Sequence, residues 1–141
     1  MKRGDAEAGV IIHESRFTYQ QAGFHEVLDL GAWWEEDSGL PIPLGGILAR
    51  RDLGSKTTQD VDLAIRASLE YARQHPGEPR AYIKDHAQEL DDTVIDAHIK
   101  LYVNDFSLDL GAEGKSAVET LLSRAEGRGL IPTSRAPLFL P

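Results

Sequence analysis

The chain has 141 residues, of which 41% are hydrophobic and 27% are charged, a length and balance typical of one folded domain. The formal net charge of −8 argues against a nucleic-acid partner, because binding to a phosphate backbone depends on clustered Lys and Arg. Cysteine is absent, which excludes disulfides, thiolate nucleophiles and Cys-based metal sites. No export signal and no stretch long enough to cross a membrane is visible, so we expect a cytoplasmic location.

Three short strands are predicted in the first part of the chain. Apolar runs with β-branched residues, bounded by Gly or polar residues, are typical of buried strands. The predicted strands span residues 8–13, 25–30 and 46–51. Between them we expect a turn or short helix at 14–21, a short helix at 31–39 closed by its final glycine, and extended backbone at 40–43, where two prolines restrict the chain.

From Thr57 onward the pattern predicts helices. Thr57 and Thr58 are candidate N-caps of a helix that ends at His75-Pro76. Further helices fit residues 78–88, 91–104 and 112–125, and an extended tail is expected for 131–141. The apolar faces of four helices need a larger surface than three short strands provide. The sequence therefore predicts that a further surface, from a partner or from a second copy, completes the fold.

The first predicted strand ends at His13, and Glu14, Ser15 and Arg16 follow it directly. Ligands of α/β proteins gather beyond the carboxyl ends of strands, so these side chains are candidates for catalysis or binding. Histidine titrates near neutral pH and can accept a proton, and a guanidinium suits a carboxylate ligand. The alternative is structural: a backbone carbonyl caps His13, and Arg16 forms a surface salt bridge. Ser15 lacks the Gly-x-Ser-x-Gly elbow of a hydrolase nucleophile.

Other chemically capable residues have structural interpretations. His75 precedes a helix-ending proline, His86 lies near a helix C-terminus and His98 belongs to an apolar stripe, so a zinc site made from them is disfavoured. Trp33 and Trp34 are followed by three acidic residues and could line a carbohydrate site. Burial of one indole against the sheet is the commoner use of such a pair.

Four separated motifs share one resemblance. They are GVIIHESRFTY at 9–19, LDLGAWWEE at 28–36, GLPIPLGGILARRDL at 39–53 and YVNDFSLDLG at 102–111. In this order they resemble the 1,4-dihydroxy-6-naphthoate synthase family of the futalosine route to menaquinone. The likeness covers the chain from Gly4 to the tail, but only the C-terminal portion of such a protein. The Ser/Asn-Pro-Cys-Pro-Asn-Asp-like stretch of the family's first lobe has no counterpart here.

The resemblance implies both a fold and an activity. The implied fold is α/β, a partial type II periplasmic-binding-protein-like fold with few strands followed by about four helices. Residues 1–53 would form the end of the second lobe and the crossing segment with the His motif, and residues 54–141 a helical part that packs on the missing first lobe. The implied enzyme is a cytoplasmic lyase that converts cyclic dehypoxanthinyl futalosine to 1,4-dihydroxy-6-naphthoate with no metal or organic cofactor.

The resemblance also implies a set of site residues. His13 matches the proposed general base of the family. The implied substrate-binding residues are Glu14, Ser15, Arg16, Leu44 and Gly45. We expect the chain to be inactive alone and to pair with an N-terminal half or with itself, with no nucleic-acid or membrane partner. Two alternatives are a non-enzymatic ligand-binding or association module of the same architecture, and the related chorismate dehydratase, although the His motif favours the synthase.

Overall fold

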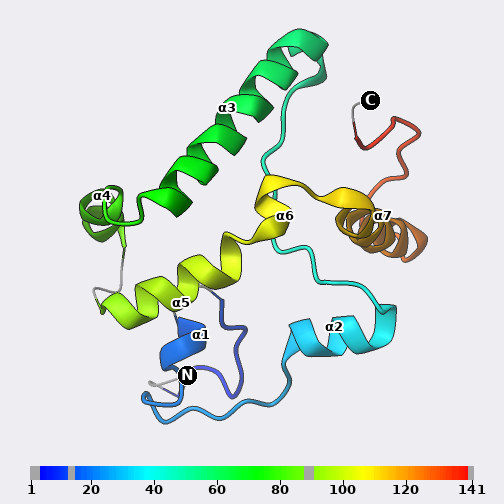
Figure 1. Ribbon diagram of the computed structural model, residues 1–141. Helices are drawn as coiled ribbons and strands as arrows, with labels where there is room; N and C mark the ends of the chain where they lie inside the picture. The colour runs from blue at the N-terminus through cyan, green and yellow to red at the C-terminus, as the bar shows by residue number, and fades with distance from the viewer. Residues whose placement is uncertain (1–3, 13–14, 88–90, 140–141) are drawn as a thin grey trace. The chain divides into compact units, whose positions relative to one another are not determined.

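The computed structural model describes residues 4–12, 15–87 and 91–139, and its regular elements are helices (Figure 1). In chain order these are α1 (Ser15–Thr18), α2 (Leu30–Ser38), the 3₁₀ turn η1 (Arg51–Leu53), α3 (Gly54–Gln74), α4 (Arg80–His86), α5 (Asp92–Tyr102), α6 (Asp105–Leu108) and α7 (Gly111–Gly127). The chain divides into two units, and each unit is built from two separate segments. Unit 1 comprises Met1–Val27 and His75–Asn104, and unit 2 comprises Leu28–Gln74 and Asp105–Pro141.

The prediction of an α/β fold is wrong, because the residues that the structure describes contain no strand. The three segments expected as strands are irregular wherever they are described, except that Leu30 opens α2 and Arg51 opens η1. A helix satisfies its backbone within itself, whereas a strand exists only through hydrogen bonds to a neighbouring strand. The apolar runs have the composition of buried strands, but no other described segment forms a strand that could pair with them. The periplasmic-binding-protein-like architecture inferred from them is corrected to an arrangement of helices.

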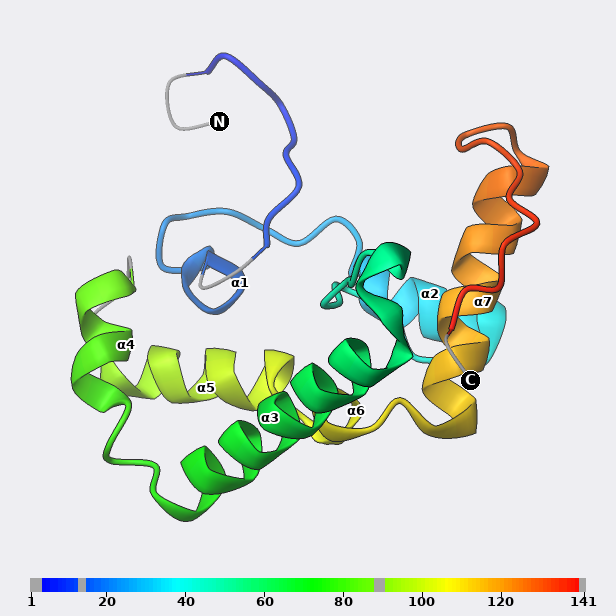
Figure 2. The ribbon, with the colours of Figure 1, turned by 90° about the horizontal axis from the view of Figure 1, so that it is seen from above.

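In unit 1, ion pairs join α4 to α5, which lie next to each other along the chain (Figure 2). Arg80 lies 2.6 Å from Asp96 and 3.1 Å from Asp92, and Lys84 lies 2.8 Å from Asp92. Ile95, on α5, is only 3% exposed. Exposed ion pairs contribute little to stability, so this charged network mainly sets how the two helices meet.

In unit 2, two helix pairs are visible from side-chain contacts. Arg124 of α7 forms an ion pair with Asp37 of α2, and its guanidinium lies 5.0 Å from the centre of the Trp34 ring. Between α3 and the α6 region, Arg73 lies 3.1 Å from Asp105, and a second such pair joins Arg66 to Asp109 at 3.6 Å. Buried Trp34 and Ala117 mark the part of this unit with the densest packing.

Most of the helices predicted from sequence are confirmed. The short tryptophan helix begins at the predicted place, where Asp29 accepts hydrogen bonds from Gly31 N at 2.8 Å and Ala32 N at 3.2 Å, and it ends at Gly39 with a φ of 68°. Helices α4, α5 and α7 lie within the predicted ranges to a few residues. By contrast, α3 begins at Gly54, so Thr57 and Thr58 lie inside it and are not N-caps. Helix α6 was not predicted.

Few apolar side chains are buried. Among the described residues, the buried hydrophobic ones are Trp34, Ile95 and Ala117. Val10, Ile47 and Leu48 are each more than three-quarters exposed, within the segments predicted as strands. None of the helices in the described ranges has the length and apolar character needed to cross a membrane. The segments with the strongest apolar patterns are therefore the least covered.

Candidate active site

Ser15 and Arg16 open α1, a single helical turn on which both residues are exposed. The turn is closed by the Tyr19 N–H, which donates to Ser15 O at 3.0 Å. The chain then reverses at Gly23, whose φ of 81° favours a residue without a Cβ. His13 and Glu14, which precede this turn in the sequence, lie outside the described residues. Ser15 and Arg16 of the His motif thus lie on a short helix that a glycine turn follows.

A tyrosine and a glutamate pair across this turn. Tyr19 Oη donates to Glu26 Oε2 at 3.1 Å, and Gln20 Nε2 donates to Tyr19 Oη at 3.4 Å. The hydrogen bond to Glu26 is the main cause that raises the pKa of Tyr19, and burial and the charge of Glu26 add to it. Tyr19 therefore stays protonated and acts as a donor. The motif at 9–19 includes Tyr19, but no local pattern pairs it with a residue seven positions later.

Leu44 and Gly45 belong to unit 2, on an irregular segment between α2 and η1. Leu44 is 59% exposed. A Cβ built at Gly45 or Gly46 would meet no atom within 4 Å, so the chain's own packing does not require glycine here. Glycine lets another molecule approach the backbone closely, which fits a binding role. The two described pairs of predicted site residues lie in different units, Ser15 with Arg16 in one and Leu44 with Gly45 in the other.

The remaining histidines make local contacts in unit 1. His86 Nδ1 lies 2.8 Å from Tyr82 O, and the two rings stack with their centres 4.3 Å apart. His98 meets Tyr102 edge to face at 4.6 Å. His75 is exposed at the end of α3. Within the described ranges, no group of three or more His, Asp or Glu side chains is arranged so that it could hold a metal ion.

The two tryptophans of α2 have different environments. Trp34 is 6% exposed, whereas Trp33 is 44% exposed. Burial of one indole is therefore confirmed, but it lies against α7 and not against a sheet. Adjacent residues on a helix point about 100° apart, so the two indoles can differ in exposure although both lie near α7.

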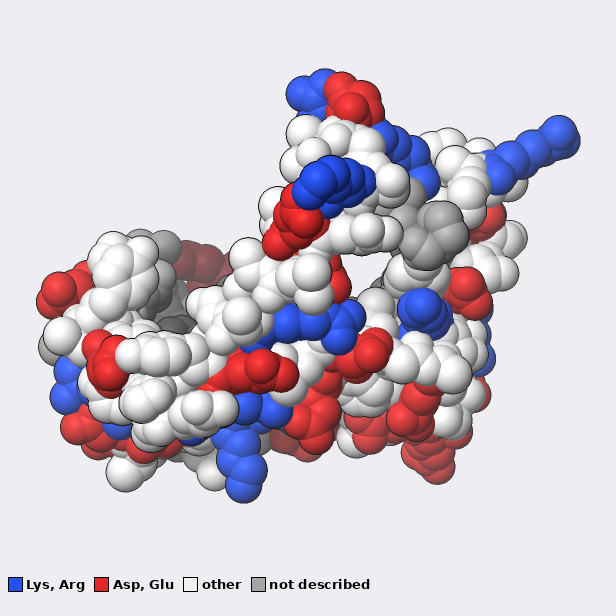
Figure 3. All heavy atoms as spheres, turned by 45° about the horizontal axis from the view of Figure 1, so that its top comes forward, with Lys and Arg blue, Asp and Glu red and all other residues white. Residues whose placement is uncertain are grey.

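Charged side chains of both signs alternate along the surface. Lys56 pairs with Asp60 at 2.7 Å and Arg66 with Asp62 at 2.8 Å, both one turn apart on α3. On the face shown in Figure 3, Lys and Arg lie among Asp and Glu and do not gather in a large basic patch. The expected small-molecule partner stays a prediction.

Comparison with known proteins defines the class. A family model described as "Menaquinone biosynthesis" matches residues 1–127. A protein of Thermus thermophilus is 57% identical over 138 residues, which are 98% of this chain and 51% of that relative. A protein of Streptomyces coelicolor is 48% identical over 132 residues, 94% of this chain and 47% of the relative. Both are named 1,4-dihydroxy-6-naphtoate synthase.

A solved structure matches as well. Protein AF1704 of Archaeoglobus fulgidus superposes with a TM-score of 0.80 and 35% sequence identity, over 86% of this chain and 46% of that one. The chain belongs to the menaquinone biosynthesis family. Its resemblance to the 1,4-dihydroxy-6-naphthoate synthases is confirmed, and it matches the C-terminal portion of those relatives. The chain spans about half the length of the curated relatives it matches.

Proposed function

We propose that this chain is the His13-bearing part of a 1,4-dihydroxy-6-naphthoate synthase, a cytoplasmic lyase that acts on cyclic dehypoxanthinyl futalosine. The observation that carries the proposal is the 57% identity over 98% of the chain to a relative of that name. The rival enzyme, chorismate dehydratase, has no comparable support among these relatives.

The proposed chemistry begins with a proton transfer. Neutral His13 takes a proton from the substrate, and the elimination and cleavage that follow release the sugar-derived fragment and leave the aromatic naphthoate. Imidazole is suited to this role because its ordinary pKa lies near neutral pH. Arg16, exposed on α1, pairs with a substrate carboxylate. Glu14, Ser15, Leu44 and Gly45 complete the proposed substrate contacts, with no metal or organic cofactor.

The proposal includes a second half of the protein, which the surface area supports. The accessible surface is 11175 Å². A compact protein of 15.5 kDa would expose about 7,200 Å², and two separate compact bodies of half that mass about 8,700 Å². If a partner covered this excess of roughly 2,500 Å² with a matching area of its own, the interface would total roughly 5,000 Å², within the range of obligate interfaces. We infer that residues 1–53 carry the active-site segment and that residues 54–141 pack on an N-terminal half.

The test joins the chain to such a half. The N-terminal portion of the Thermus thermophilus relative is fused ahead of this chain, and the product is called the joined protein below. Naphthoate formation from cyclic dehypoxanthinyl futalosine is measured for the joined protein and for the chain alone. We expect turnover only by the joined protein. His13→Asn should lower its kcat by about 10²–10⁴-fold, the usual contribution of a general base, while His25→Asn, an exposed histidine of the same unit, should not.

Each part of the proposal has its own contrary result. Turnover by the chain alone would reject the expectation that the chain is inactive without an N-terminal half. An inactive but folded joined protein would reject the synthase assignment. Full activity of the His13→Asn variant would reject His13 as the base. A joined protein that only binds the substrate would instead support the non-enzymatic binding module.

A further inference from the structure

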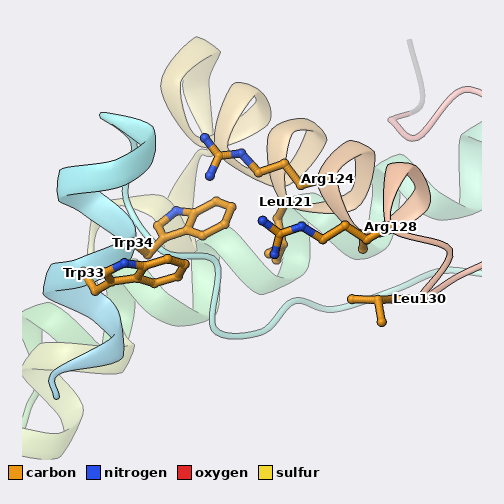
Figure 4. Close-up of a pocket in the computed structure, with 7 residues that line it drawn as sticks. Trp33, Trp34, Leu121, Arg124, Arg128 and Leu130 are labelled. Atoms are coloured by element: carbon orange, nitrogen blue, oxygen red, sulfur yellow. The ribbon is translucent and has the colours of Figure 1, made fainter. Parts of the chain in front are cut away.

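A pocket lies between α2 and α7, entirely within unit 2 (Figure 4). Its volume is about 230 Å³. This is below the about 300–1,000 Å³ of pockets for drug-sized ligands, so it suits a compact ligand of one or two rings. Its walls include Trp33, Trp34, Leu121, Arg124, Arg128 and Leu130. We refer to it as the α2–α7 pocket, and none of the predicted site residues that the structure describes lines it.

The apolar part of this pocket is open to solvent. Trp33 is 44% exposed and Leu130 is 74% exposed, so both would gain from contact with an apolar ligand. The exposed indole also provides a flat surface against which an aromatic ring can stack. An aromatic body therefore fits the pocket better than a purely polar one.

The charged part of the pocket points to an anion. Arg124 is already paired with Asp37 and lies over the Trp34 ring. Arg128 is exposed one turn further along the helix axis, at the end of α7, and forms no ion pair with any residue that the structure describes. A guanidinium binds a carboxylate through two parallel hydrogen bonds. Arg128 is thus a cation of the pocket that pairs with no carboxylate of the described residues.

A buried hydrogen-bond donor in the pocket wall, Trp34 Nε1–H, also lacks an acceptor among the described residues. The Trp34 side chain is 6% exposed. A buried donor without a partner carries a desolvation cost and calls for an explanation. An acceptor atom on a ligand in the pocket would satisfy this donor.

We propose that the α2–α7 pocket binds a small aryl carboxylate. The ring lies against Trp33 and Leu130, and the carboxylate pairs with Arg128. This assignment does not depend on the synthase activity, because it uses only residues of α2, α7 and the segment after α7.

Tryptophan fluorescence tests the proposal directly. The protein has two tryptophans, and both line this pocket, so its emission reports on this site alone. The full chain is titrated with benzoate, with neutral benzamide as the matched ligand, under excitation at the red edge of indole absorption. We expect saturable quenching by benzoate and at least tenfold weaker binding of benzamide. Arg128→Gln should remove most of this preference, while Arg135→Gln, a basic residue outside the pocket, should keep it.

Several results would overturn the proposal. Equal quenching by benzoate and benzamide would show a merely apolar patch, and the absence of saturable quenching would show no site. Emission that stays at the wavelength of exposed indole would show that Trp34 is not buried against α7. Loss of benzoate binding in the joined protein, with retention in the chain alone, would show that the other half of the protein covers the pocket.

Discussion

Arg124 serves two neighbours at once. Its guanidinium pairs with Asp37 and lies over the ring of buried Trp34, so one side chain links α7 to two neighbouring residues of α2. Arg128 lies one turn later on the same pocket and forms no such pair within the described residues. The two arginines therefore allow the contact with α2 to be separated from general effects of removing a positive charge.

Replacement of Arg124 by Met should lower the free energy of unfolding of the joined protein by about 1 kcal/mol, the sum expected for a partly exposed ion pair and a cation–π contact. Urea unfolding followed by tryptophan emission measures this change. Arg128→Met is the control and should stay within about 0.5 kcal/mol of the parent, as surface substitutions do. Equal effects of the two substitutions would mean that Arg124 does not link the helices.

Asp91 at the start of α5 should show a pH effect. Its carboxylate accepts from the Thr93 hydroxyl and from the N–H groups of Thr93, at 2.8 Å, and Val94, at 3.4 Å. The Thr93 side chain is the main cause that lowers the pKa of Asp91 below its ordinary value of 3.8. Because the folded pKa is depressed, the cap stabilises α5 fully above pH 3.8 and loses this contribution as pH falls through the lower folded value.

Thr93→Val should therefore raise the pKa of Asp91 toward 3.8 and shift the acid loss of α5 to higher pH. Carboxyl titration by NMR gives the pKa directly. Thr58→Val, in which the hydroxyl instead donates to Ser55 O inside α3, should leave it unchanged. An unaltered Asp91 pKa in the Thr93 variant would contradict the assigned cause.

At the level of elements, two of the three glycines of α7, Gly114 and Gly127, have opposite surroundings. A Cβ at Gly114 would lie 3.1 Å from Phe106 Cδ1 and 3.2 Å from Leu110 Cβ. A Cβ at Gly127 would meet nothing within 4 Å. Gly114 thus permits the close contact between α7 and the chain that precedes it, whereas Gly127 is not required by packing.

Gly114→Ala should destabilise the joined protein by about 1 kcal/mol, because the cost of overpacking exceeds the gain in helix propensity. Gly127→Ala should stabilise it by about 0.5 kcal/mol through propensity alone. Thermal unfolding of both variants, compared with the parent, checks the pair. A stabilising Gly114→Ala would show that Leu110 and Phe106 move aside easily.

Elements that depend on contacts between residues close in sequence could be predicted, whereas elements that depend on contacts between distant residues could not. Helix α5 could be predicted because Asp91 caps it and its apolar stripe lies within eleven residues. The three strands were mispredicted because an apolar run does not say whether another strand will pair with it. The sequence places the start of α3 near Thr57 and not at Gly54, because glycine is a poor helix former. The roles of Ser15 and Arg16 stay predictions, while the Tyr19–Glu26 pair could be seen only in the folded chain.

At the level of the whole molecule, the small number of buried apolar residues should affect association. Exposed apolar patches of this extent are rare on stable monomers. We predict that the chain alone forms dimers or larger species and unfolds over a broad temperature range. Sedimentation velocity and calorimetry test this. A separately produced N-terminal half should convert the chain to a one-to-one complex with a sharper transition, and a well-behaved monomer would contradict the prediction.

The two units are interleaved along the chain, since each takes one segment from before Gln74 and one from after it. The polypeptide passes from one unit to the other after Val27, Gln74 and Asn104. During synthesis, unit 1 therefore stays incomplete until Asn104 has left the ribosome, and unit 2 until the final residues have emerged. No single cut can release either unit intact, so separating them by protein engineering would require the two segments of each unit to be joined directly to each other.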